Sequence, residues 1–300
     1  MIATAIDFLL KAQNPDGGWG AGQGKRSNTE ATAFALLALR TIEDRSLTAS
    51  IDRGLTWLTE RQNADGSWPL TDQLDRGSWT TALAVLSLTH VETHQRQGLR
   101  GANWLLNQEG RDLGWLNSLL YRWAPHTLAT RLNPDLKGWP WTSNAFSWAE
   151  PTAYALIALK KLRFHLQATR AADRIRQGEL LLYDRMCKGG GWNYGNSTVL
   201  GEDLWPYSDT TAIVLIALQD RQTAEANQLS LQALQHMLSD VESGLTLSWA
   251  ILCFTLYGQD VATWQQRLAR TYDKTGFLGD TKTMALALLA SGDGAKIFQV

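Results

Sequence analysis

Four segments of this chain place a chemically useful side chain at the same offset from a Thr-Ala pair. Two positions before each threonine the residue is, in chain order, Glu30, Trp79, Glu150 and Asp209. A carboxylic acid can donate a proton to a substrate, and the face of an indole ring stabilises positive charge. We therefore regard the three acidic residues as candidate proton donors, with Asp209 first and Glu150 second.

Asp209 ranks first because of the segment that precedes it. Residues 202–207 contain two carboxylates and two aromatic rings. A helix N-terminus lowers the pKa of a carboxylic acid, whereas an acid that protonates an alkene must keep its proton at neutral pH. A second carboxylate nearby would raise that pKa, and Asp203 could supply it if the loop folds back. Asp72 and Asp75 form a second candidate pair.

A structural role also explains these carboxylates. An Asp or Glu in the first turn of a helix interacts favourably with the helix dipole, and Asp209 could cap its helix. Glu150 is followed by Pro151, and helices tolerate proline in their first turn. The residues alone leave the structural and the catalytic interpretation open.

Aromatic residues are abundant, with 14 Trp in 300 residues. Core packing explains at least half of them, and the remainder need another reason. Each aromatic face can contribute about 0.5 to 2 kcal/mol of cation–π attraction. We predict a substrate-binding wall from the aromatic residues at or near the starts of apolar segments: Trp79, Trp141, Trp148, Trp205, Tyr207 and Trp249.

The elements that must position these side chains are helices of two kinds. Six segments are apolar on every side, which predicts buried inner helices: 32–39, 81–88, 152–159, 211–218, 245–256 and 283–289. Amphipathic segments alternate with them and predict an outer layer: 2–11, 51–61, 100–107, 174–186, 229–238 and 260–272. About six helical hairpins of this kind close into an all-α toroid, an α/α barrel, which we interpret as one domain over 1–300.

A repeated motif supports the array. Gln13 to Trp19, Gln62 to Trp68 and Gln108 to Trp115 share a pattern, and a looser copy surrounds Trp192. A period near 50 residues is typical of one supersecondary unit used repeatedly. We predict that Trp19, Trp68, Trp115 and Trp192 pack between neighbouring hairpins, away from the axis. The long loop insertion at 116–149 is predicted to form a lid or wall over one mouth, or else a plug packed on the surface.

These motifs resemble the QW repeats of the squalene–hopene cyclase and protein-prenyltransferase β-subunit superfamily. The best match runs from Arg53-Gly54 through Trp57, Gln62 and Gly66 to Trp68. The resemblance implies a toroid closest in size to single-domain class II terpene cyclases. In squalene–hopene cyclases the acid is the middle Asp of an Asp-x-Asp-Asp-Thr-Ala motif. Here that position holds the four residues named at the outset, without the flanking Asp pair.

The resemblance implies an isoprenoid cyclase that protonates a linear polyprenyl chain, of a terpene or a meroterpenoid, in a central aromatic-lined cavity. The alternative is a non-catalytic toroid of the prenyltransferase and squalene-oxidase repeat type, which binds a lipid or a protein chain. A central cavity lined by Trp favours the cyclase. A cavity filled by side chains favours the binding role.

Composition excludes several other functions. The net charge of −1 and the absence of a basic tract argue against nucleic acid. Cys187 and Cys253 form no disulfide framework and have no ligand spacing to a histidine, so we predict a reducing compartment, no metal and no cofactor. Neither a signal peptide nor a spanning segment is recognisable. We expect a cytoplasmic protein, and its hydrophobic substrate could enter through peripheral contact with a membrane.

Overall fold

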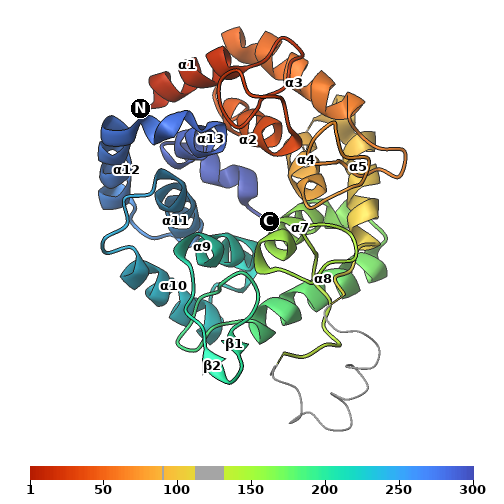
Figure 1. The fold of residues 1–300 in the computed structure, drawn as a ribbon, viewed down its shortest axis with the longest axis vertical. Coiled ribbons are helices and arrows are strands. Elements are labelled where there is room, and N and C mark those ends of the chain that lie inside the picture. Colours follow the sequence, from red (N-terminus) through yellow and green to blue (C-terminus); the bar gives the residue numbers. More distant parts are fainter. Residues whose placement is uncertain (90, 112–131) are drawn as a thin grey trace.

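A computed structural model describes residues 1–89, 91–111 and 132–300, which form an all-α toroid with one ring of helices inside another (Figure 1). The inner ring contains α2 (Thr29–Leu39), α4 (Thr80–Leu88), α7 (Ala149–Leu162), α9 (Ser208–Ala217), α11 (Gly244–Leu256) and α13 (Thr281–Ala290). The outer ring contains α1 (Ile2–Ala12), α3 (Thr48–Glu60), α5 (Gln95–Leu106), α8 (Ala168–Asp184), α10 (Glu225–Met237) and α12 (Ala262–Thr275). The predicted fold class is confirmed.

Short elements connect the two rings. Single turns of 3-10 helix are η1 (Arg45–Leu47), η2 (Glu92–His94), η4 (Arg163–His165), η5 (Gln219–Arg221), η6 (Gly276–Gly279) and the longer η7 (Asp293–Phe298). The strands β1 (Thr198–Val199) and β2 (Glu202–Asp203) pair antiparallel as a small hairpin before α9. Each inner helix contacts the next, and α13 contacts α2, so the ring is closed.

Burial follows the pattern of the sequence. The inner helices are apolar on every side and bury nearly every residue, whereas each outer helix has one apolar face directed at the inner ring. None of the described helices combines the length and the apolar character that crossing a membrane requires.

The repeated Trp residues fasten an outer helix to the inner helix that follows, and the repeated Gln residues bond to the next outer helix. Gln13 donates from Nε2 to the backbone oxygens of Gly17 and Ser50, at 2.8 Å each. The Trp19 indole donates to Leu9 O at 2.7 Å, and its backbone N–H donates to Thr32 Oγ1 at 2.9 Å. The same three kinds of contact recur at Gln62, Trp68 and Thr81, and the two Trp contacts recur at Trp192 and Thr211. Because the threonine of each Thr-Ala pair is held in this way, the residue two positions earlier lies at the same level in every repeat.

The third repeat differs from the prediction. Trp139 donates its backbone N–H to Thr152 Oγ1 and its indole N–H to Leu105 O, both at 2.9 Å. Its ring lies against Gly178, where a Cβ atom would approach to 2.7 Å, as Trp19 lies against Gly54. Trp139 therefore fills the place that the sequence assigned to Trp115, which lies outside the described residues. Of the predicted lid at 116–149, residues 116–131 also lie outside them.

Candidate functional site

The N-termini of the inner helices meet at one end of the toroid. Inner and outer helices alternate along the chain, so all inner helices run in the same direction. Loops of neighbouring repeats close this end: the backbone N–H of Ala149 donates to Tyr194 O at 2.9 Å, and that of Thr281 donates to Ala21 O at 2.9 Å. We call the ring of Glu30, Trp79, Glu150, Asp209 and Lys282 at this end the mouth.

Lys282 is a mouth residue that the sequence reasoning missed. It forms an ion pair with Glu30 at 2.8 Å, and its Nζ lies 5.4 Å from the centroid of the Phe34 ring. Burial lowers the pKa of Lys282, but the carboxylates of Glu30 and Glu150 more than offset this, and the net pKa is raised. A lysine in the first turn opposes the helix dipole, and this is the signal that could have found it.

Glu150 is the mouth carboxylate whose surroundings favour its protonated form. Burial raises the pKa of its carboxyl group, and the negative charges of Asp209 and Glu30 raise it further. Lys282 and a hydrogen bond from Tyr154 oppose this without reversing it. The Tyr154 hydroxyl donates to Glu150 Oε1 at 3.1 Å. Two candidate acids therefore meet at the mouth, and the surroundings of Glu150 favour the protonated form of its carboxyl group.

Asp209 has a partly structural role. Its Oδ1 accepts the backbone N–H of Thr210 at 2.9 Å, within the first turn of α9. Tyr194 lies near Asp209, and its ring packs on that of Tyr207 with centroids 4.8 Å apart. Burial raises the pKa of Tyr194, and the charge of Asp209 adds to that effect.

Asp203 does not join the mouth through the folded-back loop that we expected. It lies on the exposed hairpin strand β2 and forms an ion pair with Lys188 at 3.4 Å. Asp203 therefore pairs with a nearby lysine and not with Asp209, which the sequence reasoning had expected as its neighbour.

Three of the predicted aromatic residues converge beneath the mouth. Trp79 stacks on Tyr154 with ring centroids 5.6 Å apart and meets Trp141 edge to face at 4.8 Å. Trp249 lies 6.1 Å from Tyr154 and 5.9 Å from Phe34. Tyr154 and Phe34 were not predicted, although Tyr154 is four residues after Glu150 and so shares its helix face.

The remaining predicted aromatic residues lie elsewhere. Trp148 is partly exposed just before α7, and its backbone N–H donates to Trp139 O at 3.1 Å. Trp205 is 85% exposed and Tyr207 is 46% exposed, so both belong to the outer rim. Neither lines a wall around the axis.

Aromatic side chains fill the axis below the mouth. Phe34, Tyr154, Trp249 and Phe298 are each at most 1% exposed, and their ring centroids are 5.5 to 6.4 Å apart where they meet. We call this cluster the aromatic floor. Phe298 comes from η7, and the end of the chain lies near the centre of the ring in Figure 1. At this depth the structure differs from the open cavity that we predicted, and a ligand at the mouth would rest on the floor.

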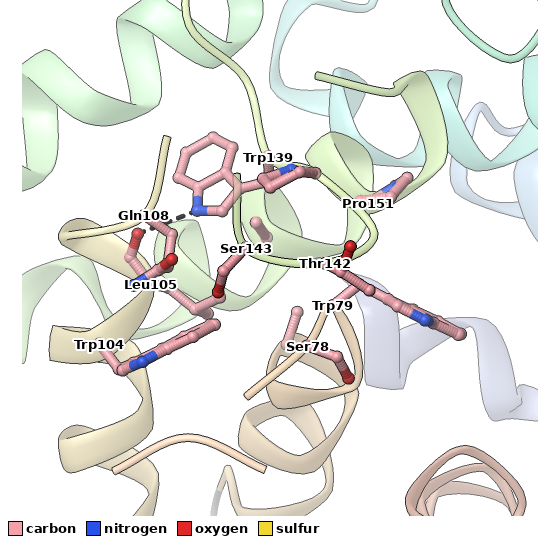
Figure 2. A pocket seen from close by; sticks show the side chains of 12 residues that line it. Ser78, Trp79, Trp104, Leu105, Gln108, Trp139, Thr142, Ser143 and Pro151 are labelled. Atoms are coloured by element: carbon pink, nitrogen blue, oxygen red, sulfur yellow. Dashed lines mark hydrogen bonds between the residues drawn. The ribbon is translucent and has the colours of Figure 1, made fainter. Parts of the chain in front are cut away.

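A small pocket beside Trp79 does not enlarge the site. It lies among α4, α5 and α7, where Trp104 and Trp139 also line it (Figure 2). Its volume of about 10 Å³ is close to the least that a single water molecule needs. This pocket therefore adds no room for a ligand beside the mouth.

The raised pKa of Glu150 predicts a specific dependence of stability on pH. Between the ordinary value of 4.5 and its raised folded value, the folded state binds more protons than the unfolded state. The free energy of unfolding should therefore fall as pH rises through this window. Urea denaturation of native and Glu150→Gln protein at a series of pH values would reveal the difference. Parallel profiles would contradict the assignment.

Comparisons with known proteins find relatives in sequence over part of the chain and in fold over nearly all of it. The family model of the squalene-hopene cyclase C-terminal domain matches residues 1–77. The type II terpene cyclase MstE from Scytonema, solved with its product merosterolic acid A, superposes with a TM-score of 0.60 and 16% identity, over 99% of this chain and 96% of that chain. The superfamily resemblance of the repeats is thus supported by a sequence match over the first quarter of the chain and by the fold of the whole.

Other proteins share the fold. An alpha-amylase from Clostridium perfringens superposes with a TM-score of 0.62 and 12% identity, over 96% of each chain. An inactive alpha-1,6-mannanase variant from Salegentibacter, in complex with alpha-1,6-mannotriose, gives 0.59 and 11%, over 99% of this chain and all of that one. In sequence, an uncharacterised protein of Bradyrhizobium diazoefficiens is 41% identical over 64 residues, which is 19% of this chain and 12% of that protein. Structural similarity at such low sequence identity shows the fold alone, so any argument about the reaction must come from the residues of the site.

Proposed function

We propose that this protein is an isoprenoid cyclase in which Glu150 protonates a linear polyprenyl chain at the mouth. The observation that carries the proposal is the partly buried Glu150 carboxyl group, which accepts a hydrogen bond from Tyr154 and whose pKa is raised by two further carboxylates. A raised pKa favours the protonated form of the carboxyl group, which is the form that can deliver a proton to an alkene. The toroid fold, shared with a type II terpene cyclase, is consistent with this chemistry.

In the proposed reaction, the proton of Glu150 forms a new C–H bond at the terminal alkene and leaves a tertiary carbocation. The next double bond attacks this cation and closes a ring, and loss of a proton at the end restores an alkene. The product is then an isomer of the substrate. The stacked rings of Trp79 and Tyr154 lie next to Glu150, where cation–π attraction would stabilise the charge by about 0.5 to 2 kcal/mol for each ring.

The direct test is turnover. Purified protein would be incubated with linear isoprenoids of 15 and 20 carbons, and the extract would be examined by gas chromatography and mass spectrometry for cyclic isomers. Cyclic product that depends on the protein supports the proposal. Absence of product from every substrate, with a lipid or protein chain bound to the purified protein, would establish the alternative.

The alternative, a non-catalytic lipid- or protein-binding toroid, is favoured by one observation. The aromatic floor occupies the axis at the depth where a long substrate would otherwise fold. In a cyclase the same floor would limit the length of the chain, because only the end of a polyprenyl chain fits above it.

Phe298→Ala should therefore shift the preference of the protein toward longer chains. Removing this buried ring opens space beneath Trp249, at a stability cost of about 3 to 5 kcal/mol. Affinities for isoprenoid alcohols of 10, 15 and 20 carbons, measured by calorimetry, would give the preference. Phe254→Ala is the matched control, because Phe254 is equally buried but packs on Trp264 of the outer ring. The same order of affinities in all three proteins would exclude the floor as a limit on length.

A further inference from the structure

A separate pocket lies at the end of the toroid opposite the mouth. It measures about 400 Å³ and lies between the C-terminal ends of α4 and α7, with Leu88, Val91 and Leu162 among the residues that line it. Pockets for small molecules commonly have volumes of about 300 to 1,000 Å³. Lys161 of this pocket and Glu150 of the mouth both belong to α7, and a helix rise of about 1.5 Å per residue places them roughly 16 Å apart along the axis.

Gly98 of α5 lines this pocket, and among the described residues no close contact there requires glycine. At Gly54, Gly101 and Gly178, which are also helical, a Cβ atom would come within 2.6 to 2.7 Å of a tryptophan ring. At Gly98 the nearest described atom to such a Cβ is Leu88 Cβ, at an ordinary 3.6 Å. Glycine within a helix is destabilising relative to alanine. A side chain at position 98 would reduce the volume of the pocket.

Lys161 supplies a positive charge to the pocket. Two other lysines of the inner ring have carboxylate partners: Lys160 pairs with Glu179 at 2.7 Å, and Lys282 pairs with Glu30. Within the part of the chain that the structure describes, Lys161 Nζ donates to the backbone oxygen of Gln299 at 2.8 Å and forms no ion pair.

Burial lowers the pKa of Lys161, since the ammonium group lies partly out of water. An anion beside it would restore the lost electrostatic stabilisation. Glu92 lies at the exposed edge of the pocket, so an anionic group is directed away from that edge and toward Lys161.

We propose that this pocket binds a small amphiphile with one carboxylate. Its apolar chain packs against Leu88, Val91 and Leu162, and its carboxylate pairs with Lys161. The site is distinct from the mouth and does not depend on the reaction proposed there.

The probes for this proposal are octanoate, 1-octanol and octylamine, which share one chain length and differ in charge. Binding to the full chain would be measured by calorimetry at low salt. We expect octanoate to bind most tightly, and Lys161→Gln to weaken octanoate about tenfold while leaving 1-octanol unchanged. Gly98→Leu should fill the pocket and weaken octanoate at least tenfold. Asn103→Leu is the matched control, because it adds the same side chain to an exposed position of α5.

Gly98→Leu should also keep or raise the melting temperature, since leucine favours the helix more than glycine does. Three results would overturn the proposal. The first is no binding of octanoate to the native protein, and the second is octanoate binding that Gly98→Leu leaves intact. The third is equal affinities for octanoate and 1-octanol in both the native protein and Lys161→Gln. If Gly98→Leu does not fold, the Lys161→Gln comparison alone decides.

Discussion

Glu150→Gln is expected to lower the turnover of a linear isoprenoid by a factor of about 10² to 10⁴, the usual effect of removing an essential proton donor. Glutamine keeps the size of the side chain and still offers an oxygen to the Tyr154 hydroxyl, but it cannot supply the proton. Because ionised Glu150 is disfavoured in the folded state, the substitution should not destabilise the protein at neutral pH. Product formation and the melting temperature would be measured on the same preparations.

Asp209→Asn and Glu30→Gln are the matched controls for this result. Each removes one mouth carboxylate that contributes to the raised pKa of Glu150, so each should reduce turnover less than Glu150→Gln does. A large loss in Asp209→Asn, with Glu150→Gln still active, would return the role of acid to Asp209. Equal losses in all three variants would indicate a collapse of the mouth rather than loss of a donor.

Trp139→Ala is expected to lower the free energy of unfolding by about 3 to 5 kcal/mol, which is the typical cost of removing a large buried aromatic side chain. The ring is 2% exposed, its indole N–H is bonded to Leu105 O, and the Arg174 guanidinium lies 3.5 Å above its centroid. Burial also lowers the pKa of Arg174, to about 10, so this cation depends on the contacts around it. Urea denaturation would give the difference in free energy.

Trp205→Ala serves as the comparison for Trp139→Ala. Trp205 is 85% exposed, and a surface substitution of this kind usually changes stability by less than about 0.5 kcal/mol. If the two variants have the same stability, Trp139 is not the tryptophan that anchors the third repeat.

The toroid and the level of the mouth residues were predictable because both depend on local signals. The period of the helices and the offset from Thr-Ala repeat along the chain, and the bonds from Trp19 and Trp68 to those threonines fix that offset in space. Trp139 could have been found in the same way, since it precedes Thr152 by the 13 residues that separate Trp19 from Thr32. Trp139 was missed because it lies much farther along the sequence from Gln108 than Trp19 lies from Gln13.

Other features depend on contacts that no local pattern records. Lys282 was missed because α13 has Met284 where most inner helices have the threonine of the pair. The aromatic floor joins α2, α7, α11 and η7, so its closure results from packing between segments far apart in sequence. Asp203 was misplaced because Lys188, on the preceding turn, competes for it.

Incubation in deuterium oxide tests the central claim most directly. If Glu150 protonates a linear isoprenoid, the acid exchanges with solvent, and the cyclic product should carry one deuterium in the methyl groups at the end of the chain where the reaction began. The label should be lost together with product formation in Glu150→Gln. A cyclic product without deuterium, or labelled product formed equally well by Glu150→Gln, would contradict proton transfer from this residue.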